Sequence, residues 1–147
     1  LESIWGSKKF FLYYMITGIG AAFLHELVMF IQAGSYTSAI AAGDMYASMK
    51  LKILMLTPTV GASGAIYGLL LAYGMMFPNN IMRLIFPPIA LKAKWFVLIF
   101  GLIEFTSGLS GTMGNSGDNV AHFAHLGGML FGLIIILIWR KNNRLYN

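Results

Sequence analysis

Ser63 and His125 are the residues of this chain best suited to nucleophilic chemistry. Ser63 lies between Gly61 and Gly64 in TPTVGASGAIYGLLLAYG, residues 57–74, where the chain becomes apolar. A serine hydroxyl is a weak nucleophile until a base removes its proton, and histidine is the usual base because imidazole titrates near neutrality. A serine in a membrane helix more often bonds back to its own helix. The position of the histidine therefore decides how Ser63 is interpreted.

A histidine inside an apolar segment is itself a candidate functional residue. His122 and His125 are three residues apart and are therefore neighbours on one helix face, a spacing that also allows metal binding. We find no convincing third ligand, because Asp118 lies in an expected loop and Glu104 on a separate apolar segment. An interhelical hydrogen bond or an interfacial position remains the alternative for both histidines. We therefore predict no metal and no cofactor.

The two acids of the apolar segments, Glu26 and Glu104, lie on segments other than those of Ser63 and His125. Neither is obviously placed to orient the imidazole, and we assign neither to a catalytic triad. For Glu104 we expect a protonated carboxyl that bonds to a neighbouring helix.

The composition indicates a polytopic membrane protein with a single domain. Of the 147 residues, 58% are hydrophobic and only 10% are charged, whereas soluble domains carry about 25% charged residues. The absence of cysteine excludes disulfides, thiolate nucleophiles and cysteine-ligated metals. The net charge of +5 does not indicate a nucleic-acid partner, since the basic residues are not gathered into one stripe.

Four segments approach the roughly 17 to 25 apolar residues that cross a bilayer. These predicted spans are Phe10–Ile31, Gly61–Phe77, Trp95–Ser110 and Val120–Trp139. The fold class is thus an all-α transmembrane bundle. Residues 78–94 contain an Asn-Asn turn and a Pro-Pro pair, which indicate a surface or interfacial loop. Residues 32–60 form a mixed connection, with a short helix expected at Met45–Leu56.

The basic residues predict the orientation of these spans. If the chain alternates sides, two basic residues (Lys50 and Lys52) lie on one face of the membrane and eight on the other; the eight are Lys8, Lys9, Arg83, Lys92, Lys94, Arg140, Lys141 and Arg144. The positive-inside rule places the larger group in the cytoplasm. The second and fourth spans then begin on the outer side, so that Ser63 and His125 both lie in the outer half of the membrane, within one helical turn of depth.

Small residues repeat every four positions on both of these spans. Gly64, Gly68 and Ala72 form one stripe, and Gly128 and Gly132 form the other. Such stripes allow two membrane helices to pack closely, and each stripe adjoins one half of the Ser63–His125 pair. Tyr67, one turn after Ser63, could pack its ring against the imidazole or serve ordinary interfacial packing.

Two motifs resemble those of the rhomboid family of intramembrane serine proteases. GASGAIYG is similar to the GxSGxxxG signature of that family, and AHFAHLGGMLFG to its AHxxGxxxG helix. The resemblance implies that Ser63 is the nucleophile and His125 the general base of an endopeptidase that cleaves transmembrane segments of membrane proteins. It also implies that Tyr67 packs beside the base, whereas His122 falls outside the register. Gly61 and Gly64 would allow the turn that presents the hydroxyl.

The resemblance covers what would be helices three to six of a six-helix core. The first residues, LESIWGSKKF, resemble the junction after the second helix and not a signal peptide, so we expect a fragment truncated at its N-terminus. The HxxxN motif, whose side chains help to hold the oxyanion in rhomboids, is absent. His25 does not replace it, because no asparagine follows four residues later. Whether this chain folds and acts alone therefore stays open.

Two alternatives to the protease remain. A rhomboid-like protein could bind membrane helices without cutting them, although such proteins usually lack the nucleophile or the base. A transporter or channel could use Glu26, Glu104 and the histidines as an ion path. We expect transmembrane protein substrates, contacts with membrane lipid and a bacterial plasma membrane as the location.

Overall fold

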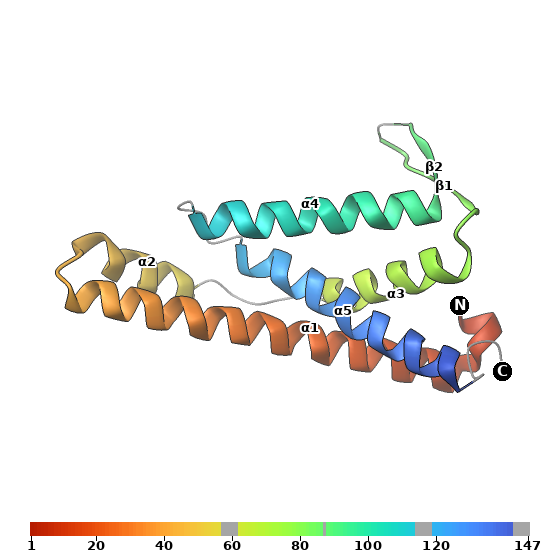
Figure 1. Ribbon diagram of the computed structural model, residues 1–147, viewed down its shortest axis with the longest axis horizontal. Helices are drawn as coiled ribbons and strands as arrows, with labels where there is room; N and C mark the ends of the chain where they lie inside the picture. The colour runs from red at the N-terminus through yellow and green to blue at the C-terminus, as the bar shows by residue number, and fades with distance from the viewer. Residues whose placement is uncertain (57–61, 87, 114–118, 143–147) are drawn as a thin grey trace.

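The computed structural model describes residues 1–56, 62–86, 88–113 and 119–142 (Figure 1). Within these residues the chain is helical apart from one pair of short strands, in agreement with the predicted all-α class. The elements in chain order are α1 (Glu2–Ala41), α2 (Met45–Leu56), α3 (Ser63–Met76), β1 (Ile81–Arg83), β2 (Ala90–Lys92), α4 (Ala93–Met113) and α5 (Asn119–Lys141).

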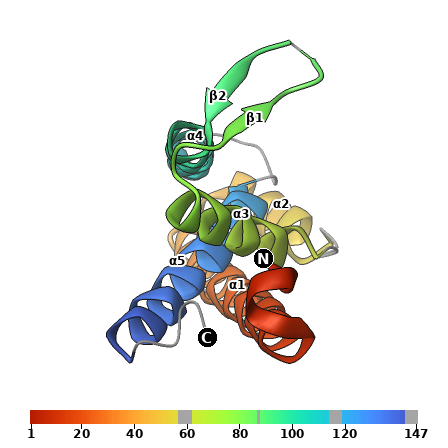
Figure 2. The same cartoon turned by 90° about the vertical axis from the view of Figure 1, so that its right-hand side faces the viewer.

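The centre of the bundle is formed by α3 and α5, each of which contacts both α1 and α4. The outer helices α1 and α4 lie on opposite sides and share no contact among the described residues (Figure 2). The start of α1 and the end of α5 lie at one end of the bundle, and α2 lies at the other (Figure 1). Because α3 and α5 both run away from the α2 end, their first turns lie on the same side of the molecule.

Among the described residues, three helices are long and apolar enough to cross a membrane, on the segments Glu2–Ala41, Ala93–Ser110 and Ala121–Lys141. They correspond to the first, third and fourth predicted spans. The second predicted span is the apolar helix α3, whose 14 residues cover about 21 Å at 1.5 Å per residue. That length is below the roughly 30 Å of a bilayer core, so the count of four spans stays a prediction.

Helix α1 is longer than the sequence predicted, because it continues beyond Ile31 to Ala41. In this extension the hydroxyls of Thr37 and Ser38 donate to the carbonyls of Ala33 and Gly34, four residues back, so these polar side chains are satisfied within the helix. Gly43, with φ of 93°, then turns the chain into α2, which packs back against α1. The short helix predicted at Met45–Leu56 is confirmed with the same bounds.

The predicted loop between the second and third spans contains an antiparallel hairpin. Ile81 pairs with Lys92, and Arg83 with Ala90. The sequence prediction that this segment is not a further span agrees with the structure, but the strands were not predicted. Three paired residues on each side are too few to produce a clear alternation of apolar and polar residues.

Tyr13 connects α1 to α3 in the buried core near the chain termini. Its side chain is fully buried among Trp5, Ala72 and Ile136, and its hydroxyl donates to the Gly68 carbonyl at 2.9 Å. Its Oη also lies where a side chain on Gly132 would have to go. Tyr13 therefore combines a hydrogen bond between helices with close packing at the crossing of α1, α3 and α5.

We predict that Tyr13→Phe lowers the free energy of unfolding by about 1 kcal/mol, since hydrogen bonds between membrane helices contribute roughly 0.6 kcal/mol on average and up to about 1.7. Reversible unfolding in mixed micelles measures this loss. Tyr46→Phe, at a position that is 78% exposed, is the matched control. Equal stability of the two variants would show that the Tyr13 hydroxyl contributes nothing.

Candidate active site

Ser63 is the first residue of α3, and its side chain is exposed. Ala62 precedes the helix with φ of −75° and ψ of 7°, and its carbonyl accepts the first helical hydrogen bond, from the N–H of Ile66. The N–H groups of the first helical turn have no acceptor within their own helix. The start of α3 thus presents a hydroxyl together with backbone N–H groups that have no acceptor within the helix. Gly61, predicted to shape this turn, lies outside the described residues.

His125 lies in the second turn of α5 and faces Ser63. Its Nε2 is 2.9 Å from the Ser63 Oγ, within hydrogen-bond distance. The imidazole stacks on the ring of Tyr67, with ring centroids 4.2 Å apart and planes 12° from parallel. The structure thus brings together Ser63 and His125, which the sequence placed in one layer, and packs Tyr67 against the imidazole, one of the two roles that the sequence left open for it.

The glycine stripes of α3 and α5 lie face to face beneath this pair. A side chain at Gly128 would overlap the backbone carbonyl of Gly64, and one at Gly68 would come within 3.0 Å of the Gly128 carbonyl oxygen. A side chain at Gly132 would approach the Gly68 Cα to 3.4 Å. The two backbones are therefore in direct contact, and this contact determines how closely α5 carries His125 to the start of α3.

The carboxylate of Glu104 on α4 lies beside both histidines, contrary to the sequence-based expectation that no acid orients the imidazole. Its Oε2 is 2.6 Å from Nδ1 of His122 and 3.0 Å from Nδ1 of His125. The other oxygen, Oε1, accepts a hydrogen bond from the Tyr67 hydroxyl. The expected bond to a neighbouring helix is therefore present, but it is one of three contacts. The expectation that no acid is placed beside the imidazole is therefore wrong.

The sequence does carry a signal for this cluster. Buried acids in membrane helices are rare and need partners, and His122 and His125 already occupied one face of one helix. The sequence did not show which residues of α4 lie beside His122 and His125 of α5, because local patterns carry no information on how two helices align. The other acid considered, Glu26, is exposed on α1. His25 is buried on the same helix, and Asp118 lies outside the described residues.

Glu104, His122 and His125 could also be considered as metal ligands, because one donor atom of each lies within 4.8 Å of the others. Ligands that surround zinc tetrahedrally at about 2.0–2.1 Å are roughly 3.3 Å apart. The observed separations of 2.6 and 3.0 Å from the carboxylate are those of hydrogen bonds. The distances within the cluster are thus closer to those of side chains joined by hydrogen bonds than to those of a metal site.

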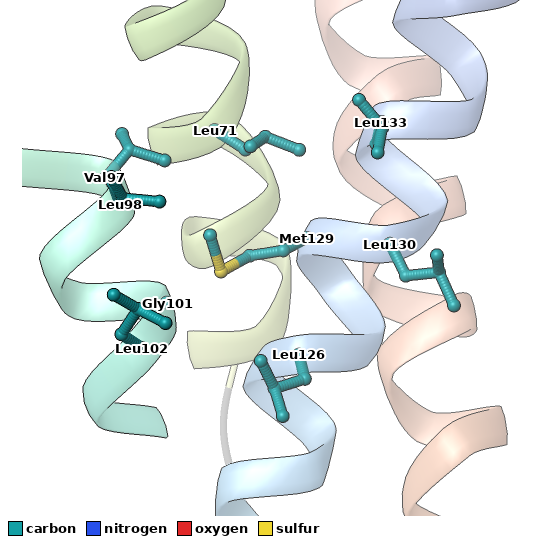
Figure 3. Close-up of a pocket in the computed structure, with 9 residues that line it drawn as sticks. All are labelled: Leu71, Val97, Leu98, Gly101, Leu102, Leu126, Met129, Leu130 and Leu133. Carbon is teal, nitrogen blue, oxygen red and sulfur yellow. The ribbon is translucent and has the colours of Figure 1, made fainter. Parts of the chain in front are cut away.

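An apolar cavity of about 310 Å³ lies between α3, α4 and α5 (Figure 3). Its lining includes Leu71 of α3 and Met129 of α5. Leu102, two residues before Glu104, and Leu126, directly after His125, also belong to this lining. The polar cluster is therefore bordered by an entirely hydrophobic space.

The fold and the site together define a helical membrane protein with a serine–histidine pair at the contact between two glycine-rich helices. The family model of the rhomboid domain matches residues 1–142. The chain belongs to the rhomboid family, whose members are generally intramembrane serine proteases, and it is an integral membrane protein. Comparisons with curated proteins and with solved structures gave no match.

Proposed function

We propose that this protein is an intramembrane serine endopeptidase that cleaves transmembrane segments of membrane proteins, with Ser63 as nucleophile and His125 as general base. The observation that carries the proposal is the 2.9 Å separation between Ser63 Oγ and His125 Nε2. A nucleophile and its base must lie within about 2.6–3.2 Å for proton transfer, and this pair does.

The reaction we infer is acyl transfer. As Ser63 Oγ attacks the peptide carbonyl carbon, its proton passes to His125 Nε2, and the carbonyl π electrons move to the oxygen. His125 then gives this proton to the leaving amine, and a water molecule, deprotonated by His125, hydrolyses the acyl-enzyme. The neutral imidazole must therefore carry its own hydrogen on Nδ1.

Free backbone donors at the start of α3 support stabilisation of the oxyanion. The N–H groups of Ser63 and Gly64 belong to the first turn, where helices leave donors unpaired, and the helix dipole favours negative charge there. Gly64 has no side chain and packs against Ala21 and the Ala124 backbone. These donors would lie next to the attacking hydroxyl without any rearrangement of α3.

Access to water supports a hydrolytic role. Ser63 is exposed, although it begins an apolar helix. Under the positive-inside rule the end of the bundle that holds the start of α1 and the end of α5 faces the cytoplasm, so Ser63 and His125 lie in the outer half of the membrane, where water can enter. We place the protein in a bacterial plasma membrane, with membrane lipid and transmembrane substrates as its partners.

The alternatives are less well supported. A helix-binding protein without activity has no need of a hydroxyl and an imidazole at proton-transfer distance. A transport path would need linked polar groups through the bundle, but Glu26 is exposed on α1 while Glu104 is held by Tyr67 and the histidines.

Cleavage in proteoliposomes tests the proposal. The substrates are single-span peptides whose apolar segment is interrupted by Gly or Pro, with a fluorophore at one end. We expect wild-type protein to release the labelled fragment and Ser63→Ala to release none. Cleavage that continues unchanged in a folded Ser63→Ala variant would refute the proposed nucleophile.

A further inference from the structure

We propose that Glu104 is a positioning residue for the Ser63–His125 pair, holding the imidazole of His125 with Nδ1–H toward its carboxylate and Nε2 toward Ser63. This inference rests on the proposed protease function and extends it from a pair of residues to a chain that runs from Ser63 through His125 to Glu104. The three residues come from α3, α5 and α4, respectively.

The first observation is the environment of Nδ1 of His125. This nitrogen is buried, and Glu104 Oε2 lies 3.0 Å from it, although the alignment falls short of a regular hydrogen bond. Because Nε2 must accept the proton of Ser63, Nδ1 must carry hydrogen, and a buried N–H needs an acceptor. A small rotation of either side chain would complete this bond.

The second observation is that Glu104 is held in place by other donors. The side chain of Glu104 is only 8% exposed. Tyr67 donates its O–H to Oε1, and Nδ1 of His122 lies 2.6 Å from Oε2. With His125, three potential donors converge on one carboxyl group, and a carboxylate is a side chain that only accepts. Because Tyr67 of α3 and His122 of α5 hold the Glu104 carboxyl in place, this carboxyl can in turn hold the imidazole of His125.

Tyr67 links the carboxylate and the imidazole directly. Its ring stacks on His125 at 4.2 Å, while its hydroxyl binds Glu104. The stack restricts the plane of the imidazole, and the carboxylate determines which nitrogen faces outward within that plane. Together, Tyr67 and Glu104 determine the plane of the His125 imidazole and its orientation within that plane, so that Nε2 faces Ser63 for proton transfer.

The apolar cavity offers no substitute for the carboxylate on its own side of the cluster. On the side of the cluster where Leu102 and Leu126 lie, the space between α3, α4 and α5 is lined by aliphatic side chains, Met129 and Gly101 (Figure 3). An imidazole that lost Glu104 would find no acceptor among these residues. The loss of the carboxylate should therefore affect the chemistry.

In the reaction step, Glu104 takes no proton. The Oγ–C bond forms as the Ser63 proton moves to Nε2, which leaves an imidazolium beside the carboxylate, and their attraction stabilises the transition state. Replacement of the Glu104 carboxylate by an amide removes that attraction and allows His125 to carry its hydrogen on Nε2 instead of Nδ1. In a serine protease triad the corresponding change lowers kcat by about 10⁴-fold; because His122 and Tyr67 remain here, we expect about 10²- to 10⁴-fold.

The experiment compares wild type, Glu104→Gln and Glu104→Asp in the proteoliposome assay, with Glu26→Gln on the exposed face of α1 as the matched control. We expect Glu104→Gln to lower kcat by about 10²- to 10⁴-fold, with KM changed less than threefold. The kcat of Glu104→Asp should be at least tenfold higher than that of Glu104→Gln. Glu26→Gln should have the kcat of wild type. A purely structural role would instead lower the folded fraction and leave kcat per folded molecule unchanged.

A second measurement needs no variant of Glu104. Nitrogen NMR of protein labelled with ¹⁵N-histidine, recorded over a series of pH values so that the neutral ring is identified from its own signals, reports which ring nitrogen carries hydrogen. His125 should be the Nδ1–H tautomer, its signals being assigned by their loss in His125→Gln. A kcat for folded Glu104→Gln within threefold of wild type would overturn the role of Glu104 while the Ser63–His125 pair stands. An Nε2–H tautomer would contradict both the role of Glu104 and the proposed base, because Nε2 could then not accept the proton of Ser63. An inactive wild type would instead refute the protease function itself.

Discussion

Replacement of Ser63 or His125 by alanine is expected to lower kcat for peptide cleavage by up to about 10⁶-fold, the loss found when a serine protease loses its nucleophile or base. The physical reason is the direct contact of the two groups, 2.9 Å apart. Without the imidazole the hydroxyl keeps its proton, and without the hydroxyl no acyl-enzyme forms. Steady-state cleavage in proteoliposomes measures the loss.

The double variant distinguishes a catalytic pair from two separate contributions. Because the two side chains act in one step, Ser63→Ala/His125→Ala should be no slower than the slower single variant. Ser38→Ala is the matched control, since the Ser38 hydroxyl is exposed and bonds back to the Gly34 carbonyl. Losses that multiply in the double variant would contradict the proposed pair.

The second large effect is expected at Gly128, where α5 lies against the backbone of α3. Even the single methyl of Gly128→Ala would overlap the Gly64 carbonyl, so the two helices must separate. Overpacking in a tight interface costs about 1–3 kcal/mol. The activity should fall as well, by roughly 100-fold, because Gly128 lies within one turn of His125 and an error of about 1 Å in position is enough for such a loss.

Gly34→Ala is the control for this prediction. Gly34 also lies inside a helix, but a methyl group there meets nothing within 4 Å. Alanine is favoured over glycine in a helix by about 1 kcal/mol, so Gly34→Ala should be neutral or stabilising. Unfolding in mixed micelles and cleavage rates provide both readouts. If Gly128→Ala were as stable and as active as Gly34→Ala, the close contact of α3 and α5 would not exist.

The parts of the fold predicted from sequence depend on strong local patterns. The long apolar runs predicted the positions of α1, α4 and α5, and the short helix expected within the mixed connection is α2 at Met45–Leu56. The extension of α1 to Ala41 was missed because its polar residues look like a loop. In the structure, Thr37 and Ser38 satisfy their hydroxyls within the helix, a contact that composition does not reveal.

The part of the candidate site that lies on α3 and α5 was predictable from the sequence, whereas the part on α4 was not. Charge counts and helix lengths placed Ser63 and His125 at one depth, and the glycines of α3 and α5 indicated which faces could meet. Glu104 was missed for a physical reason: α4 runs antiparallel to both helices, and its register against them depends on tertiary packing. In the structure, the hydrogen bonds of the Glu104 carboxyl with Tyr67 and His122 show this register most clearly.

The most direct test of the account is labelling with a fluorophosphonate, which forms a stable bond to an activated serine without any need for a substrate. Wild-type protein in detergent is treated with the probe, and the modified residue is located by mass spectrometry of its peptides, alongside His125→Ala. The account predicts one adduct, on Ser63, and its loss in the folded His125→Ala variant. An adduct on a different serine, or a folded wild type that is not labelled, would contradict the claim that His125 activates Ser63.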